Sequence, residues 1–269
     1  RIKAGSIRAR GEDITRCPER RMCQLRGKLF SMVFQDPMTA LNPAMTVGEQ
    51  IGEAVLVHRP RLGKRALRTR VAELMELVGI DHPEERMGLC PYSFSGGMRQ
   101  RVVMAIALAG EPAILFADEP TTALDVTIQA QILDLLRQVQ HRLGTATVFV
   151  THDLGLVARA ADRVAVMYAG KLVEIGTAEE IFYDPRHPYT WGLLGALPAL
   201  HRGRDSLTAI PGMPPDLLRP PRGDAFACRN VYALDIDYEE EQPMFQITDT
   251  HFAATWLLDR RAPNISPPA

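Results

Sequence analysis

Residues 112–125 read Pro-Ala-Ile-Leu-Phe-Ala-Asp-Glu-Pro-Thr-Thr-Ala-Leu-Asp. The apolar residues 113–117 predict a strand that is buried on both faces, as in the middle of a parallel sheet. Asp118 and Glu119 follow, and Pro120 ends the strand because proline has no N–H to donate. Open α/β sheets bind ligands at the carboxyl ends of their strands. The stretch therefore predicts a site at a sheet edge, whereas a lone Asp-Glu pair is more often a solvated turn.

Other motifs occur before and after this stretch in a fixed order. They are Gln35-Asp36-Pro37, Ser95-Gly96-Gly97-Met98-Arg99-Gln100, Ala123-Leu124-Asp125 and Thr151-His152-Asp153. Together with Asp118 and Glu119 as Walker B, they resemble the Q-loop, signature, D-loop and switch histidine of an ATP-binding-cassette (ABC) ATPase. Residues 35–43, 121–131 and 187–190 resemble the oligopeptide/dipeptide importer branch in particular. The similarity extends over essentially all 269 residues.

The resemblance implies an α/β fold of the P-loop NTPase (RecA-like) class, with a parallel-sheet core, an all-helical ABC subdomain and a C-terminal importer extension. The expected division is a partial ATPase core (1–43), a helical subdomain with the signature (44–109), the rest of the core with Walker B, the D-loop and the switch histidine (110–184), and the extension (185–269).

The local patterns agree with this division. Apolar runs predict strands at 28–35, 113–118 and 145–151, and the last two form a βαβ unit with a helix at 126–143. Helices are predicted at about 46–57, at about 64–78 and from Ser95 onward, the first of them opened by a Thr46–Glu49 capping box. Residues 163–168 and 171–176 predict a hairpin.

Three side chains are expected to carry the chemistry. A carboxylate beside a bound nucleotide can deprotonate the attacking water, and this role is given to Glu119. Gln35 can ligate through its oxygen or position water, and His152 can accept from water or donate to the γ-phosphate. Asp118 and Gln35 are expected to hold Mg²⁺, which prefers oxygen ligands. In isolation each residue would more often be a polar group at a strand end or turn.

The signature segment, residues Ser95, Gly96, Gly97, Met98, Arg99 and Gln100, is predicted to bind nucleotide. Its two glycines let the backbone approach an anion, and the helix that follows supplies free N–H groups. The resemblance implies that this segment closes on the nucleotide of the opposite subunit, and that Asp125 reports across the dimer interface. The alternative is a plain glycine-containing N-cap.

ATPases of this kind need a phosphate loop, G-x-x-x-x-G-K-[ST], whose N–H groups and lysine hold the phosphates. None occurs between Arg1 and Ala269. The resemblance would put the loop before Arg1, so we expect a chain truncated at its amino end that is inactive by itself. True degeneration of the loop is the other explanation, and the coding DNA upstream would separate the two.

Family members often carry four cysteines in the C-terminal extension that hold an iron–sulfur cluster. The corresponding positions here are Asp224, Asn230, Asp237 and Thr255. We therefore expect no iron–sulfur cluster. A polar network is expected in its place, with Arg229 facing Asp224 or Asp237.

Composition limits the class of protein. The net charge is −1, which argues against a polyanion-binding protein, and the arginine-rich residues 1–28 read as solvated surface rather than a nucleic-acid or lipid contact. No apolar run approaches the length of a membrane span, and four scattered cysteines do not form a disulfide framework. The compartment is expected to be reducing cytosol.

The resemblance then implies an ATP-binding and ATP-hydrolysing subunit that lies peripherally on the cytoplasmic face of the membrane and powers peptide import. Its cofactors would be ATP and Mg²⁺. Its partners would be a second ABC ATPase subunit, identical or homologous, transmembrane permease subunits and, indirectly, a peptide-binding protein, with no nucleic acid. The alternatives are a non-hydrolytic module that contributes only a signature face, and an ABC ATPase of DNA repair or translation.

Overall fold

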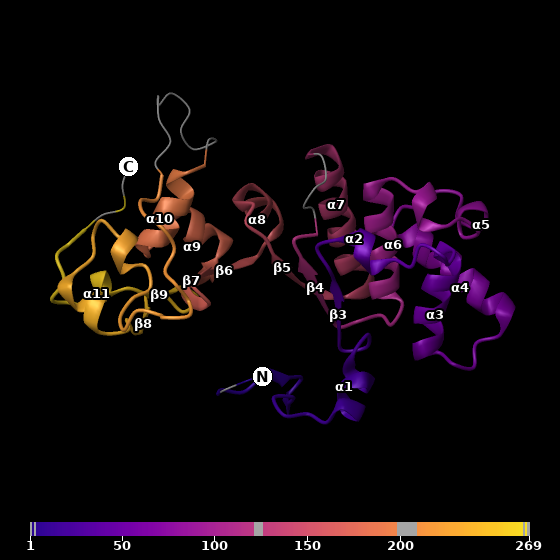
Figure 1. Cartoon of the computed structure of the whole chain (residues 1–269), viewed down its shortest axis with the longest axis horizontal. Helices are drawn as coiled ribbons and strands as arrows, with labels where there is room; N and C mark the ends of the chain where they lie inside the picture. The colour runs from indigo at the N-terminus through magenta and orange to yellow at the C-terminus, as the bar shows by residue number, and fades with distance from the viewer. Residues whose placement is uncertain (1, 3, 121–125, 198–208, 266, 268–269) are drawn as a thin grey trace. The chain divides into compact units, whose positions relative to one another are not determined.

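The computed structural model describes residues 2, 4–120, 126–197, 209–265 and 267 (Figure 1). The chain divides into two compact units, Arg1–His152 and Asp153–Ala269. Within the described residues, no helix combines the length and the apolar character that crossing a membrane requires.

A three-stranded parallel sheet forms the centre of the first unit. Its strands are β3 (Phe30–Val33), β4 (Ile114–Asp118) and β5 (Ala146–Val150), in the order β3-β4-β5. The helix α7 (Val126–Leu143) connects β4 to β5, which confirms the predicted βαβ unit. The apolar run at 113–117 therefore lies in the central strand of the sheet.

The two faces of this sheet differ in burial. On one face Val33 and Leu115 are fully buried and pack in the same core as helices α6 (Gly96–Leu108) and α7. On the other face Met32, Phe116 and Val148 are neighbours in the register and are 40%, 37% and 42% exposed. The prediction that the central strand is buried on both faces is wrong for the described residues, because their helices pack on one face only.

Between β3 and β4 the regular elements are all helical. α3 (Val47–His58) begins with the predicted capping box, since Thr46 and Glu49 bond each other's backbone. α4 (Lys64–Leu77) and α6 pack against it through Ile51, Leu74 and Met104, which are fully buried. The remaining elements of this unit are β1 (Arg8–Ala9), β2 (Glu12–Asp13), α1 (Glu19–Leu25), α2 (Pro37–Ala40), α5 (Pro83–Arg86) and η1 (Pro91–Ser93).

Two glycines allow the end of α3 to approach the sheet. A Cβ on Gly27 would lie 2.3 Å from Nε2 of His58, and a Cβ on Gly110 would lie 2.0 Å from the carbonyl oxygen of Gly27. At Gly110 the obstructing atom belongs to the backbone and cannot easily move, and Gly27 has a φ of 78°, which side chains rarely adopt, so both positions favour glycine. This joint holds α3 beside the starts of β3 and β4.

An antiparallel sheet of order β6-β7-β9-β8 organises the second unit. The predicted hairpin is present as β6 (Arg163–Tyr168) and β7 (Lys171–Thr177), and its turn residues Ala169 and Gly170 have φ of 48° and 80°. The other elements are α8 (Leu154–Ala160), α9 (Ala178–Tyr183), α10 (Pro188–Gly195), η3 (Ala227–Arg229), α11 (Asp235–Glu239), β8 (Met244–Gln246), β9 (Phe252–Ala254) and η4 (Trp256–Leu258).

A buried carboxylate links three segments of the second unit. Glu174 on β7 accepts hydrogen bonds from the backbone N–H groups of Arg186 (2.6 Å) and His187 (3.1 Å). It also contacts Nε2 of His251 at 2.8 Å, and both side chains have 0% exposure. His187 begins α10, where its Nδ1 accepts from the backbone N–H of Tyr189. Glu174 therefore fixes the start of α10 and the approach to β9.

The four positions considered above as possible cluster ligands, Asp224, Asn230, Asp237 and Thr255, are buried polar residues. Each accepts a nearby backbone N–H group, from Phe226, Tyr232, Leu234 and Leu257 respectively.

The prediction that Arg229 faces Asp224 or Asp237 is wrong. Its guanidinium donates to the carbonyl oxygens of Ile210 and Pro211 and to the hydroxyl of Tyr168. Both carboxylates already accept local backbone N–H groups, and the guanidinium bonds to the carbonyl oxygens of residues 210 and 211 instead.

Candidate active site

Three strand ends bring the predicted catalytic side chains together. Gln35, Glu119 and His152 come shortly after β3, β4 and β5, which are parallel neighbours, so their carboxyl ends lie at one sheet edge. Nε2 of Gln35 donates to Oε2 of Glu119 at 2.8 Å, and Nδ1 of His152 lies 3.0 Å from Oε1 of the same carboxylate. The convergence expected from the sequence is present.

Glu119 leaves the strand in an unusual backbone conformation. Its φ is 42°, in the left-handed region that non-glycine residues seldom adopt. Its N–H still donates to the carbonyl oxygen of Val150 at 2.8 Å, so β5 holds the turn in place. Such outliers persist where the surrounding structure fixes them, and they cluster at functional sites. The sequence gives no signal of this conformation except that Pro120 must end the ladder.

The exposures of the site residues suit a reaction with a bound ligand. The side chain of Glu119 is 26% exposed and that of His152 is 78% exposed. A half-covered carboxylate is therefore held between an amide and an open imidazole. Water and a phosphate group can reach both His152 and Glu119 without any rearrangement of the core.

Asp118 and Gln35 fit the magnesium ligands that the sequence predicts. Asp118 ends β4 and is half-buried, and it has no ion pair with another described residue. Gln35 uses its Nε2 for Glu119, which leaves its amide oxygen as an acceptor. Among the described residues there is no group of three or more His, Cys, Asp or Glu side chains that could hold a metal alone.

The signature segment begins α6 as predicted. Ser95 is the N-cap, and its hydroxyl accepts from the backbone N–H of Met98 at 3.4 Å. Gly97 is needed for packing, because a Cβ there would lie 2.7 Å from Cγ2 of Ile128 on α7. The sequence did not reveal this dependence on α7, which only the packing of two helices can create.

The rest of the signature segment is turned toward the protein. Nε of Arg99 donates to the carbonyl oxygen of Pro91 at 2.9 Å, and Met98 packs against the core. The side chain of Gln100 is 1% exposed, and neither of its amide atoms has a hydrogen-bond partner among the described residues. Ser95 and Gly96 are therefore the exposed part of the segment. Asp125 lies outside the described residues.

Comparison with known proteins gives the family. A profile described as ABC transporter matches residues 1–122, and one described as the C-terminal region of oligopeptide/dipeptide transporters matches residues 173–236. The chain is 58% identical over 268 residues to the oligopeptide transport ATP-binding protein OppD of Bacillus subtilis, covering 99% of this chain and 75% of the relative. It is 54% identical to the dipeptide transport ATP-binding protein DppD of Lactococcus lactis, covering 99% and 76%. The chain belongs to the oligopeptide/dipeptide family of ABC transporter ATP-binding subunits.

A solved structure supports the fold of this ABC subunit. The dimeric, post-hydrolysis ATP-binding cassette MJ0796, bound to ADP and Pi, matches with a TM-score of 0.58 and 25% sequence identity, over 65% of this chain and 74% of that chain. This confirms the predicted P-loop NTPase class. ABC subunits bind nucleotide, hydrolyse ATP and work as dimers with permease partners, and this subunit shares that general function through its family.

Proposed function

We propose that this ABC subunit hydrolyses ATP to power the import of oligopeptides or dipeptides, with Glu119 as the general base. The observation that carries the proposal is the convergence of Gln35 and His152 on the carboxylate of Glu119, at 2.8 Å and 3.0 Å. A general base must lie within hydrogen-bond reach of the water it deprotonates, and its orientation must be fixed. Gln35 and His152 supply that orientation from the two neighbouring strands.

Each side chain then has a separate task. Glu119 takes the proton of the attacking water, whose oxygen bonds to the γ-phosphorus as the bond to ADP breaks. His152 donates a hydrogen bond to the γ-phosphate, and Gln35 positions the water and the metal. Mg²⁺, held by Asp118 and Gln35, would neutralise charge on the phosphates.

The nucleotide-binding site is completed by a second ABC ATPase subunit, which is identical or homologous. Ser95 and Gly96 offer the exposed start of α6 to the phosphates of the partner's nucleotide. Gly97, Met98, Arg99 and Gln100 hold this start against α7 and η1, and Asp125 reports across the interface. ATP hydrolysis is thereby coupled to the separation of the two subunits.

A groove beside α3 suits the permease partner. It has a volume of about 800 Å³ and lies between α3, α4 and the residues after α5, with Leu56, Val57, Leu67, Val71 and Met87 in its lining. An apolar groove of this kind accepts an amphipathic helix. A short helix of the transmembrane permease is the proposed occupant, which makes the subunit peripheral on the cytoplasmic face. A peptide-binding protein takes part indirectly, and nucleic acid does not.

The C-terminal extension is proposed to work without an iron–sulfur cluster. Its four candidate positions carry oxygen and amide side chains that already accept backbone N–H groups. Thiolates are the ligands that such clusters require. A purified subunit with cluster absorbance and stoichiometric iron and sulfide would contradict this part of the proposal.

The decisive test is Glu119→Gln in the assembled importer. The change removes the base and keeps the shape of the side chain, so ATP turnover should fall by roughly 10²–10⁴-fold while ATP binding is retained. Glu76→Gln, an exposed carboxylate on α4, serves as the matched control and should leave turnover unchanged. Equal turnover in Glu119→Gln and the parent would remove Glu119 from the role of base.

A further inference from the structure

A strongly basic segment joins α3 to α4. Residues 58–70 read His-Arg-Pro-Arg-Leu-Gly-Lys-Arg-Ala-Leu-Arg-Thr-Arg, with six Lys or Arg and no carboxylate, in a chain whose net charge is −1. A run of cations without a carboxylate in an otherwise balanced protein favours a local electrostatic contact. Another cluster, the arginines of residues 1–28, provides a comparison within the same molecule.

Ion pairs with carboxylates of the same chain neutralise part of this charge. Arg59 and Arg70 both pair with Glu111, at 2.7 Å and 2.9 Å, and Arg70 also pairs with Glu73 at 2.9 Å. Arg68 pairs with Glu84 at 2.6 Å. The two pairs with Glu111 link Arg59, directly after α3, and the middle of α4 to the segment before β4.

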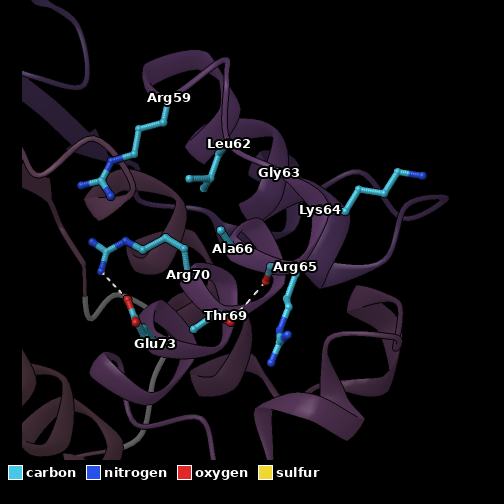
Figure 2. A pocket seen from close by; sticks show the side chains of 9 residues that line it. All are labelled: Arg59, Leu62, Gly63, Lys64, Arg65, Ala66, Thr69, Arg70 and Glu73. Carbon is cyan, nitrogen blue, oxygen red and sulfur yellow. Dashed lines mark hydrogen bonds and ion pairs between the residues drawn. The ribbon is translucent and has the colours of Figure 1, made fainter.

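Three cations of the segment are left without a carboxylate partner among the described residues: Arg61, Lys64 and Arg65, all of them exposed. Lys64 and Arg65 line a hollow of about 760 Å³ at the start of α4, and Arg61 lies three residues before Lys64 in the chain. Figure 2 shows that Lys64 and Arg65 extend in different directions, away from Arg59 and Arg70. Side chains that spread apart do not enclose one compact anion. They suit an extended surface that carries many negative groups.

Apolar groups accompany these cations. Pro60, which directly precedes Arg61, is exposed, and Val57 lines the neighbouring groove that is assigned to the permease helix. Long cationic side chains beside exposed apolar groups favour an interface between water and lipid, where the charge meets headgroups and the apolar part meets the acyl boundary.

The segment lies away from the nucleotide. Arg59 pairs with Glu111, which comes before β4 begins at Ile114, whereas Glu119 comes after β4 ends at Asp118. The basic surface and the catalytic edge are therefore at opposite ends of the same strand. A partner that closes on the nucleotide leaves Arg61 and Arg65 free.

We propose that this basic surface (Arg61, Lys64 and Arg65, with Pro60) contacts anionic phospholipid headgroups of the membrane that holds the permease. The inference rests on the proposed function, because only a membrane-bound importer keeps the subunit beside a bilayer. Each Lys or Arg near an anionic leaflet strengthens binding by roughly five-fold. The contact strengthens the attachment of the subunit to the membrane without taking part in hydrolysis.

The test is co-sedimentation of the purified subunit with vesicles of phosphatidylcholine containing phosphatidylglycerol, and with vesicles of phosphatidylcholine alone. Arg61→Glu/Arg65→Glu should weaken binding to the anionic vesicles by at least about 10-fold, since two cations are reversed. Lys64 is left in place because it also lines the apolar groove. Arg16→Glu/Arg20→Glu, two exposed arginines of the other cluster, is the matched control and should bind as the parent does.

Four outcomes would overturn the proposal. The first is equal binding of the parent to both kinds of vesicle, and the second is unchanged binding of the Arg61→Glu/Arg65→Glu variant. The third is a loss of vesicle binding in the control variant instead. The fourth is that the parent binds a single-stranded oligonucleotide more tightly than it binds anionic vesicles, and that the Arg61→Glu/Arg65→Glu variant loses this oligonucleotide binding. Urea unfolding of the variant checks that it is folded. ATP turnover of the importer in detergent separates the two proposals, because the Arg61→Glu/Arg65→Glu variant should keep it whereas Glu119→Gln should lose it.

Discussion

His152 and His251 each contact a glutamate at nearly the same distance, but their surroundings differ. His152 lies 3.0 Å from Glu119 with 78% of its side chain exposed, and His251 lies 2.8 Å from Glu174 with none exposed. A pair that water reaches gains little stability, because water screens the charges. A buried pair is essential once it exists, because the loss of one partner leaves the other buried and unpaired. The first pair is therefore available for chemistry, and the second holds the fold.

His152→Ala tests the exposed pair. Turnover in the importer should fall by about 10²-fold or more, because the carboxylate of Glu119 loses one of its two orienting partners and the γ-phosphate loses a donor. The urea midpoint should stay unchanged, since the imidazole is mostly in solvent. Steady-state ATPase assays and urea titrations provide the two readouts. A variant that lost stability and activity together would show that His152 has a structural role.

Glu174→Ala tests the buried pair. Two backbone N–H groups and the imidazole of His251 would lose their acceptor inside the protein. The unfolding free energy should fall by about 3–5 kcal/mol, measured by urea titration of the second unit. Glu239→Ala, an exposed carboxylate at the end of α11, is the control and should change it little. A loss of similar size in both variants would contradict the interpretation.

At the candidate site, the sequence predicts correctly the positions that depend on where strands end. Gln35, Glu119 and His152 each follow an apolar run, and parallel neighbouring strands must bring such residues to one edge. The left-handed φ of Glu119 and the inward direction of Gln100 could not be predicted. Both depend on contacts between segments far apart in the sequence. The prediction of which residues Arg229 contacts was wrong for the same reason.

At the scale of elements, the local signals were reliable. The capping box at Thr46, the cap at Ser95 and the hairpin turn at Ala169 and Gly170 are each decided within a few residues, and the structure contains all three. The burial of the central strand, by contrast, is not determined by the local sequence. Apolar residues on both faces of β4 cannot indicate which face a helix covers, and Phe116 is 37% exposed.

Gly110→Ala tests the joint between the helices and the sheet. The added Cβ would lie 2.0 Å from the carbonyl oxygen of Gly27 and 2.8 Å from Nε2 of His58, so backbone must move. The unfolding free energy of the first unit should fall by about 1–3 kcal/mol. Gly88→Ala is the matched control, because its Cβ would meet only an ordinary contact at 3.8 Å. Equal melting temperatures for the two variants would contradict the close approach.

At the scale of the whole molecule, acidic pH acts on the second unit in opposite directions. Burial lowers the pKa of His187 from 6.5 to about 3. Stability from this group is present above pH 6.5 and is lost as the pH falls toward 3, because the unfolded chain takes up the proton first. Burial raises the pKa of Asp224 and Asp237 above 3.8. Stability from these groups is present below 3.8 and is lost as the pH rises through their raised pKa values.

Asp237→Asn separates these opposing effects. The asparagine oxygen can still accept from the N–H of Leu234, but it removes a buried negative charge that faces Asp224. At neutral pH the variant should therefore be more stable than the parent. The advantage should shrink as the pH falls and vanish below 3.8, where the carboxyl group is protonated in both the folded and the unfolded parent. Because His187 is present in both proteins, its contribution cancels in the difference between their urea unfolding free energies. An advantage that stayed constant from neutral pH to below 3.8 would show that the gain comes from packing or hydrogen bonding and not from the charge of Asp237.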